Sequence, residues 1–170
     1  LVALLAKQNN DSVGLGLFAA EMELFLPLQK SRNALQRLLL ALLEPRALAP
    51  ATDLAKALTF VREHQRRQAV IFIVSDFYTP PFEEELRALC FRHDVICVLG
   101  DNNWDSELPD VGLARLQDAE NGRYWEVDAG SPAVRRALAK MQNDRITALR
   151  TCCERVGADF LILGDQPLAS

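Results

Sequence analysis

The sequence has no excess of positive charge and no long hydrophobic run. Its 170 residues include 19 basic and 23 acidic side chains, which give a net charge of −4. The chain therefore has no excess positive charge that would attract the phosphates of a nucleic acid. The longest apolar runs, such as Leu38–Leu43 and Val70–Val74, fall well short of the roughly 20 residues that span a bilayer. We therefore expect no nucleic-acid partner and no membrane span in this chain, and we place it in the cytoplasm.

The sequence also lacks the short motifs of covalent catalysis and phosphate binding. No serine or cysteine stands in a nucleophile elbow, and there is no Walker glycine loop. Gly14 and Gly16 fall inside a predicted strand, where we expect them to let a helix pack closely on the sheet. The four cysteines, which we expect to be buried and reduced because no C-x-x-C spacing occurs, are Cys90, Cys97, Cys152 and Cys153.

Length and composition predict one domain over residues 1–170. A chain of this length that is 49% hydrophobic can enclose one good core and is short for two. The first third predicts the end of an apolar helix at Leu1–Lys7, strands at Val13–Phe18 and Met22–Leu26, and helices from Ser31 to Leu43 and from about Thr52 to Gln68. The two strands are close enough for an antiparallel edge hairpin, and Pro27 is expected to end it.

The rest of the chain predicts strands and helices in alternation. Val70–Val74 is a continuous run of β-branched and aromatic residues, which indicates a parallel strand buried on both faces. Further elements are expected at Glu83–His93 (helix), Val95–Leu99 (strand), either side of Asn121–Gly122 (hairpin), Ser131–Gly157 (helix) and Phe160–Leu163 (strand). This order predicts an α/β fold with a doubly wound, mostly parallel, Rossmann-like sheet and an antiparallel edge hairpin.

Three aspartates follow predicted strands, at positions where ligands bind in such sheets. They are Asp76, Asp101 and Asp165. Asp76 has a second interpretation, because it could simply stabilise the helix that begins after Pro81. Thr52 likewise has the interpretation of a helix N-cap.

Four segments, taken in order, resemble a known bacterial family. They are Asp11–Phe18, Ala51–Ala55, Val70–Phe77 and Glu107–Gly112. Together they make nearly the whole chain similar to the family called domain of unknown function 58, known as a von Willebrand factor A-like fold. The resemblance implies that the N-terminal strand of that fold, with its Asp-x-Ser-x-Ser loop, is absent from this chain.

The same resemblance implies a metal-ion-dependent adhesion site. Such a site takes an Asp-x-Ser-x-Ser loop, a threonine and a later aspartate, and Thr52 and Asp76 match the last two. Mg²⁺ prefers hard oxygen ligands and leaves one position for a carboxylate of the partner. With only two protein ligands we expect Mg²⁺ binding by this chain to be weak or absent. Ala51 departs from the glycine usual before that threonine.

Our first hypothesis is a non-enzymatic protein-interaction domain. Its partner would dock at the strand ends near Thr52, Asp76 and the loops that carry Tyr78 and Trp104. The resemblance implies that a MoxR-type AAA+ ATPase is a candidate partner. It also allows the parent protein to have a membrane anchor upstream of residue 1. A sheet without its central strand could close by forming a homodimer or exchanging strands.

The alternative hypothesis is a Mg²⁺-dependent hydrolase that uses Asp76, Asp101 and Asp165 as ligands. It ranks second because the strand-end loops offer no histidine or lysine as a base. The acidic loop Asp101–Asp110 lacks the alternation of a calcium loop and is expected to be solvated. His64 and His93 are interpreted as structural.

Overall fold

The computed structural model describes residues 2–30, 32–44, 51–100, 112–117 and 124–163. The chain forms two compact units, Leu1–Arg66 and Arg67–Ser170. The single domain over residues 1–170 stays a prediction from the sequence. No helix among the described residues is long and apolar enough to cross a membrane.

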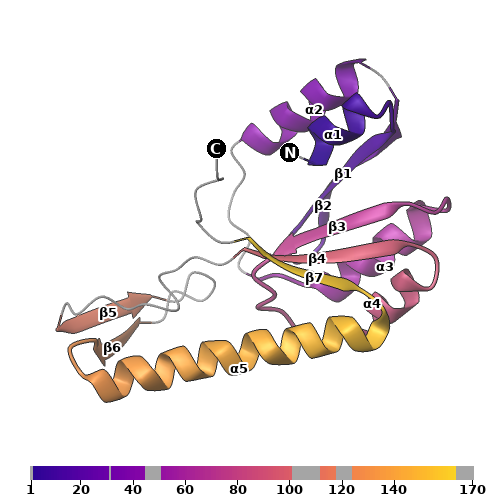
Figure 1. The fold of residues 1–170 in the computed structure, drawn as a ribbon. Helices are drawn as coiled ribbons and strands as arrows, with labels where there is room; N and C mark the ends of the chain where they lie inside the picture. Colours follow the sequence, from indigo (N-terminus) through magenta and orange to yellow (C-terminus); the bar gives the residue numbers. More distant parts are fainter. Residues whose placement is uncertain (1, 31, 45–50, 101–111, 118–123, 164–170) are drawn as a thin grey trace. The chain divides into compact units, whose positions relative to one another are not determined.

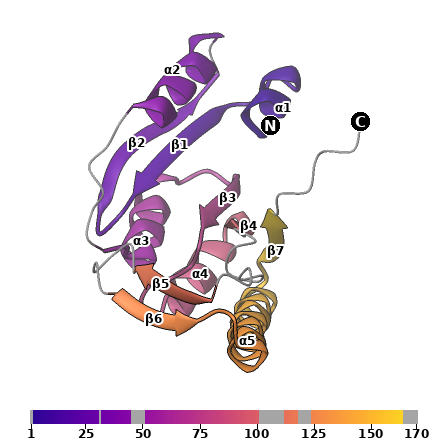
Figure 2. The ribbon, with the colours of Figure 1, turned by 90° about the vertical axis from the view of Figure 1, so that its left-hand side faces the viewer.

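The first unit is built on an antiparallel hairpin, as the sequence predicted. Its elements are α1 (Val2–Gln8), β1 (Val13–Phe18), β2 (Met22–Gln29), α2 (Arg32–Leu43) and α3 (Leu54–His64). β1 and β2 pair along their length, as Figure 2 shows. The helix α2 packs through Ala34, Leu35 and Leu38, whereas Leu40 and Leu43 on its other side are exposed. The apolar side chains of this helix are therefore only partly buried.

Aromatic contacts join α3 to the hairpin. The Phe25 ring of β2 meets the Phe60 ring of α3 edge-on, with centroids 5.3 Å apart. His64 stacks on Phe60 at 3.8 Å, and its Nδ1 lies 2.8 Å from the Phe60 carbonyl oxygen. His64 thus packs at the end of its helix, which agrees with the structural role predicted for it.

The strand β2 continues past Pro27 to Gln29, so the prediction that this proline ends the hairpin is wrong. Val13 pairs with Gln29, but Leu15 pairs with Leu26. Two steps along β1 therefore match three along β2, which is the pattern of a β-bulge. A bulge leaves a residue out of the ladder, and so it accommodates a proline that has no N–H to donate.

Gly14 makes room for the neighbouring strand and not for a helix, contrary to the sequence-based expectation. A Cβ added at Gly14 would lie 2.8 Å from the Leu26 carbonyl oxygen and 3.2 Å from the Leu28 nitrogen. At Gly16 the nearest atom would be the Met22 sulfur, at an ordinary 3.4 Å. Only the first glycine is therefore required by a close approach of backbone.

The second unit contains a parallel sheet in the order β3-β4-β7 and a separate antiparallel ribbon. Its elements are β3 (Val70–Ser75), α4 (Glu83–Cys90), β4 (Asp94–Gly100), β5 (Leu113–Gln117), β6 (Tyr124–Asp128), α5 (Pro132–Val156) and β7 (Asp159–Leu163). Both the parallel strands and the second hairpin confirm the predicted order. Figure 1 shows α5 running from the ribbon of β5 and β6 to the start of β7.

The sheet of this unit buries one face against α4 and α5. Cys97 of β4 and Cys153 of α5 are both fully buried, and Cys97 pairs in register with Ile73, so Ile73 is on the same face. The opposite face of β3 carries Val70 and Phe72, which are 57% and 38% exposed. The prediction that β3 is buried on both faces is therefore wrong, because α4 and α5 contact each other and lie on one side.

The helix α5 begins and ends at the residues that the sequence indicated. Ser131 is its N-cap and Pro132 its first residue, where the missing N–H costs nothing. Gly157 follows the last turn with φ of 83°, the left-handed conformation that ends helices at glycine. The side chains that fix its C-terminal half in the core are Leu149, Cys153 and Val156.

The two glycines of β1 offer a matched test of the hairpin. We expect Gly14→Ala to lower the free energy of unfolding by about 1–3 kcal/mol, because the new methyl group meets the backbone of β2. Gly16→Ala is the control and should change it by less than about 0.5 kcal/mol. Chemical denaturation of the purified variants measures both, and equal losses would contradict the close approach at Gly14.

Candidate functional site

The structure describes two of the residues that the sequence singled out as ligands. Thr52 belongs to the first unit and Asp76 to the second. Asp101, Asp165 and Trp104 lie outside the described residues. Of the predicted site, the surroundings of Asp76 are therefore the part that the structure defines in detail.

The N-cap of α3 is Asp53 and not Thr52, so the capping interpretation of Thr52 is wrong. The Asp53 Oδ1 accepts a hydrogen bond from the Lys56 backbone N–H at 3.1 Å. The Asp53 N–H donates to the Ala19 carbonyl oxygen at 2.9 Å, which ties the start of α3 to the end of β1. Thr52 stands one residue before the cap, and its predicted part in a metal site stays a prediction.

Asp76 directly follows β3, in a short turn that its own side chain stabilises. Its Oδ1 accepts a hydrogen bond from the Tyr78 N–H at 3.1 Å and a long one from the Ser75 hydroxyl at 3.5 Å. The Ser75 Oγ in turn accepts from the Phe77 N–H at 3.0 Å. The N-cap of α4 is Phe82, so Asp76 does not cap that helix. The structure therefore gives Asp76 a role in closing the turn after β3 and no capping role at α4.

Phe77 has a backbone conformation that is rare for a residue with a side chain. Its φ of 57° is in the left-handed region, which costs about 1–2 kcal/mol for an L-residue other than glycine. Its ring is buried, with a centroid 5.9 Å from that of Phe82. Burial of the ring and the two turn hydrogen bonds therefore offset the backbone strain.

Two residues of α5 hold this turn from the side, and the sequence pattern indicated neither of them. The Arg145 Nη1 donates to the Asp76 carbonyl oxygen at 2.8 Å, and its guanidinium lies 4.0 Å from the centroid of the Tyr78 ring. The Arg145 Nε donates to the Gln142 Oε1 at 3.2 Å. The available signal was weak, because an Arg and a Gln three residues apart on a long helix are common on exposed surfaces.

The chemistry at Asp76 fits a magnesium ion in kind but not in number. A carboxylate and a neighbouring hydroxyl are hard oxygen donors of the type that Mg²⁺ takes. Among the described residues, however, no group of three or more His, Cys, Asp or Glu side chains is placed to hold a metal. Water would therefore supply most of the ligands of an ion bound through these oxygens.

The cysteines gather between β4, α4 and α5 and are free thiols, as predicted. The hydrogen bond with Cys153, followed by burial, raises the pKa of Cys97. Burial is also the main cause that raises the pKa of Cys90 and of Cys152. These three thiols are therefore protonated at neutral pH. The predicted burial is confirmed for Cys97 and Cys153, whereas Cys90 and Cys152 are only half-buried.

Comparison with protein families gives one match that covers most of the chain. The family described as "Protein of unknown function DUF58" matches residues 1–148. Uncharacterized protein Rv1480 of Mycobacterium tuberculosis is 39% identical over 118 residues, which are 65% of this chain and 35% of that protein. Uncharacterized protein MAV169 of Mycobacterium avium is 36% identical over 115 residues, 65% of this chain and 66% of that protein.

The chain thus spans about a third of the length of the first of these relatives. Among solved structures, it resembles the crystal structure of conserved hypothetical protein BatB from Bacteroides thetaiotaomicron with a TM-score of 0.52. That match covers 97% of this chain and 77% of the other at 14% sequence identity. At this identity the likeness concerns the α/β fold alone.

The start of α3 provides a test that separates Asp53 from Thr52. We expect Asp53→Ala to lower the free energy of unfolding by about 1 kcal/mol, because the Lys56 N–H loses its acceptor. Thr52→Ala should cost clearly less, since the threonine is not the N-cap. Thermal or denaturant unfolding measures the difference, and a larger loss for Thr52→Ala would reverse this assignment.

Proposed function

The chain belongs to the DUF58 family, and from this premise we propose that it is a non-enzymatic domain for binding another protein. The partner would dock at the end of β3 that carries Asp76. The observation that supports this most directly is the position of an exposed carboxylate at the carboxyl end of a parallel strand, inside a turn held by four hydrogen bonds and one cation–π contact. Such strand ends are where ligands bind in parallel α/β sheets.

We further propose that the docking site is of the metal-dependent adhesion type within a von Willebrand factor A-like fold. Asp76 would contribute one oxygen ligand, and the bound Mg²⁺ would attract an acidic side chain of the partner. Thr52, the other residue that the family resemblance matches, lies in the first unit, and its part in metal binding stays a prediction. The family resemblance makes a MoxR-type AAA+ ATPase the first partner to test.

The turn that carries Asp76 is ordered, and this favours a binding role for Asp76 over that of a merely solvated aspartate. A site that binds a charged partner works best when its groups are already in place, because no ordering entropy is then lost on association. The Asp76 turn meets this condition, since both its backbone amides and its carbonyl oxygen have partners. An aspartate in an unrestrained loop would lack them.

Metal titration tests this proposal. Calorimetry with Mg²⁺ and Mn²⁺ compares this chain with one extended upstream by about 40 residues of its parent protein, the length of a βα unit. We expect the extended chain to bind clearly tighter and Asp76→Ala to abolish the binding. Asp94→Ala is the matched control, because Asp94 is exposed at the opposite end of the same sheet and should leave the affinity unchanged.

Failure of both chains to bind either ion would remove the metal from the proposal. Binding that survives Asp76→Ala would place the ion elsewhere. In either case, docking at the Asp76 turn would have to occur without a shared ion.

The hydrolase hypothesis predicts a different result in a simple assay. Its other two carboxylates, Asp101 and Asp165, lie outside the described residues, and the α5 side chains that contact the Asp76 turn are those of Arg145 and Gln142. We expect no phosphate release from generic phosphoesters with Mg²⁺ present. Turnover that Asp76→Ala eliminates and Asp94→Ala preserves would replace the binding proposal with the enzymatic one.

A further inference from the structure

The turn that carries Asp76 is connected to α5 through a small network of side chains. Arg145 makes three contacts at once: with the Asp76 carbonyl oxygen, with the Gln142 side chain and with the face of the Tyr78 ring. Gln142 is only 6% exposed, and its Oε1 accepts hydrogen bonds from both Arg145 and the Tyr78 hydroxyl, the latter at 3.5 Å. The network therefore closes on itself.

This network acts on the part of the turn that most needs support. The carbonyl oxygen that Arg145 binds belongs to the peptide group between Asp76 and Phe77, and Phe77 is the residue with φ of 57°. A strained residue of this kind persists only where its surroundings restrict it. The hydrogen bond fixes one side of the strained residue, and the stacked Tyr78 ring fixes the other.

The far end of α5 makes the support rigid. Leu149 and Cys153 lie one and two turns beyond Arg145 and are buried in the core. Side chains three or four residues apart on a helix share one face, so Gln142, Arg145 and Leu149 follow one side of α5. The core contacts therefore fix the position of α5 along its axis, and with it the place where Gln142 and Arg145 contact the turn.

We propose that Gln142 and Arg145 are positioning residues that hold the Ser75–Tyr78 turn in the conformation in which the Asp76 carboxylate binds its ligand. The ligand part of this inference rests on the proposed function above. The positioning part concerns the turn itself and has a measurement of its own. Arginine suits the role because its planar fork donates in two directions while its face stacks on an aromatic ring.

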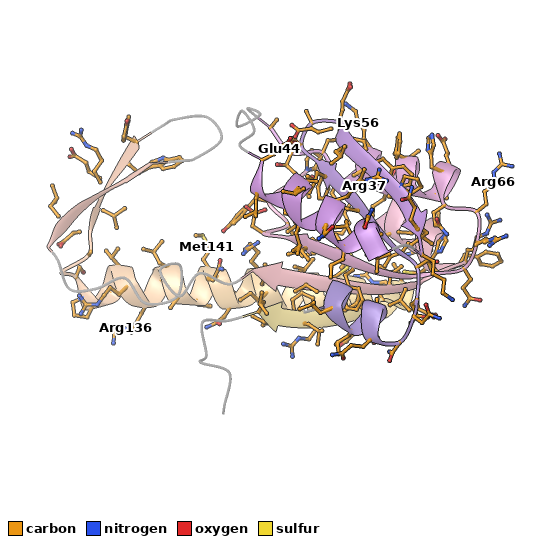
Figure 3. The ribbon with its side chains drawn as sticks, turned by 90° about the horizontal axis from the view of Figure 1, so that it is seen from above. Arg37, Glu44, Lys56, Arg66, Arg136 and Met141 are labelled. Atoms are coloured by element: carbon orange, nitrogen blue, oxygen red, sulfur yellow. The ribbon has the colours of Figure 1, made fainter. Side chains whose placement is uncertain are left out.

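The first experiment reads the turn without any metal. Backbone amide shifts of this chain are recorded for Arg145→Gln, for Arg145→Lys, and for Arg136→Gln as the control on the same helix. Arg136 is exposed and extends from the part of α5 nearer the ribbon (Figure 3). We expect the amide shifts of Phe77 and Tyr78 to change strongly with Arg145→Gln, less with Arg145→Lys, and not at all with Arg136→Gln.

In Arg145→Lys we expect the amide shifts to return only partly toward those of the unmodified chain. Lysine keeps the positive charge but lacks the planar guanidinium that donates in two directions. Unchanged Phe77 and Tyr78 amides in Arg145→Gln would overturn the inference. Shifts spread evenly along α5 and β4 would also overturn it, because they would mean that the helix repacks as a whole.

The second experiment measures Mn²⁺ affinity in the upstream-extended chain. Loss of residues that orient a metal ligand typically weakens metal binding by about 10- to 100-fold, and we expect a loss in this range for Arg145→Gln. Arg136→Gln should bind as the unmodified chain does. An unchanged affinity in Arg145→Gln would overturn the positioning role even if its melting temperature fell.

The two proposals fail in distinguishable ways. If the unmodified extended chain binds no Mn²⁺, the metal-dependent function fails, and the amide shifts alone decide whether Arg145 positions the turn. If the extended chain binds Mn²⁺ but the shifts do not move, the function stands and the positioning role fails.

Discussion

The packing of α5 against the parallel sheet is the contact on which the second unit depends. Cys97 of β4 and Cys153 of α5 are hydrogen-bonded to each other and fully buried, and Leu86 and Leu89 of α4 are fully buried as well. Because this helix is 25 residues long, its other half extends past the sheet to the ribbon of β5 and β6. This buried contact therefore determines where α5 meets the Asp76 turn.

The sequence predicted those elements whose signals are local. Short continuous apolar runs identified β3, β4 and β7, and the pair Ser131-Pro132 with Gly157 marked both ends of α5. Two short strands on either side of a turn sufficed for each hairpin. In each case the physical cause lies within the segment itself, in backbone conformation, capping or a missing N–H, so no knowledge of distant neighbours was needed.

Several predictions failed, or residues were missed, because contacts between separate elements decide them, whereas the N-cap of α3 was misplaced by one residue among local signals. Arg145 contacts a carbonyl group 69 positions earlier, which no periodicity reveals. The exposure of Val70 and Phe72 depends on which side α4 and α5 cover, and the role of Gly14 depends on how closely β2 approaches. Asp76 was found because strand ends are recognisable, whereas the residues that hold it come from the tertiary fold.

Position 77 has a consequence for mutational tolerance. Its backbone favours glycine, yet its buried ring beside Phe82 favours a large apolar side chain, and no amino acid meets both demands. A change to glycine would relax the backbone and empty part of the core, while a change to another apolar residue would keep the strain and fill the space less well. Both the backbone conformation and the buried ring therefore restrict which residues can replace Phe77, even though Phe77 itself offers no group that could bind a ligand.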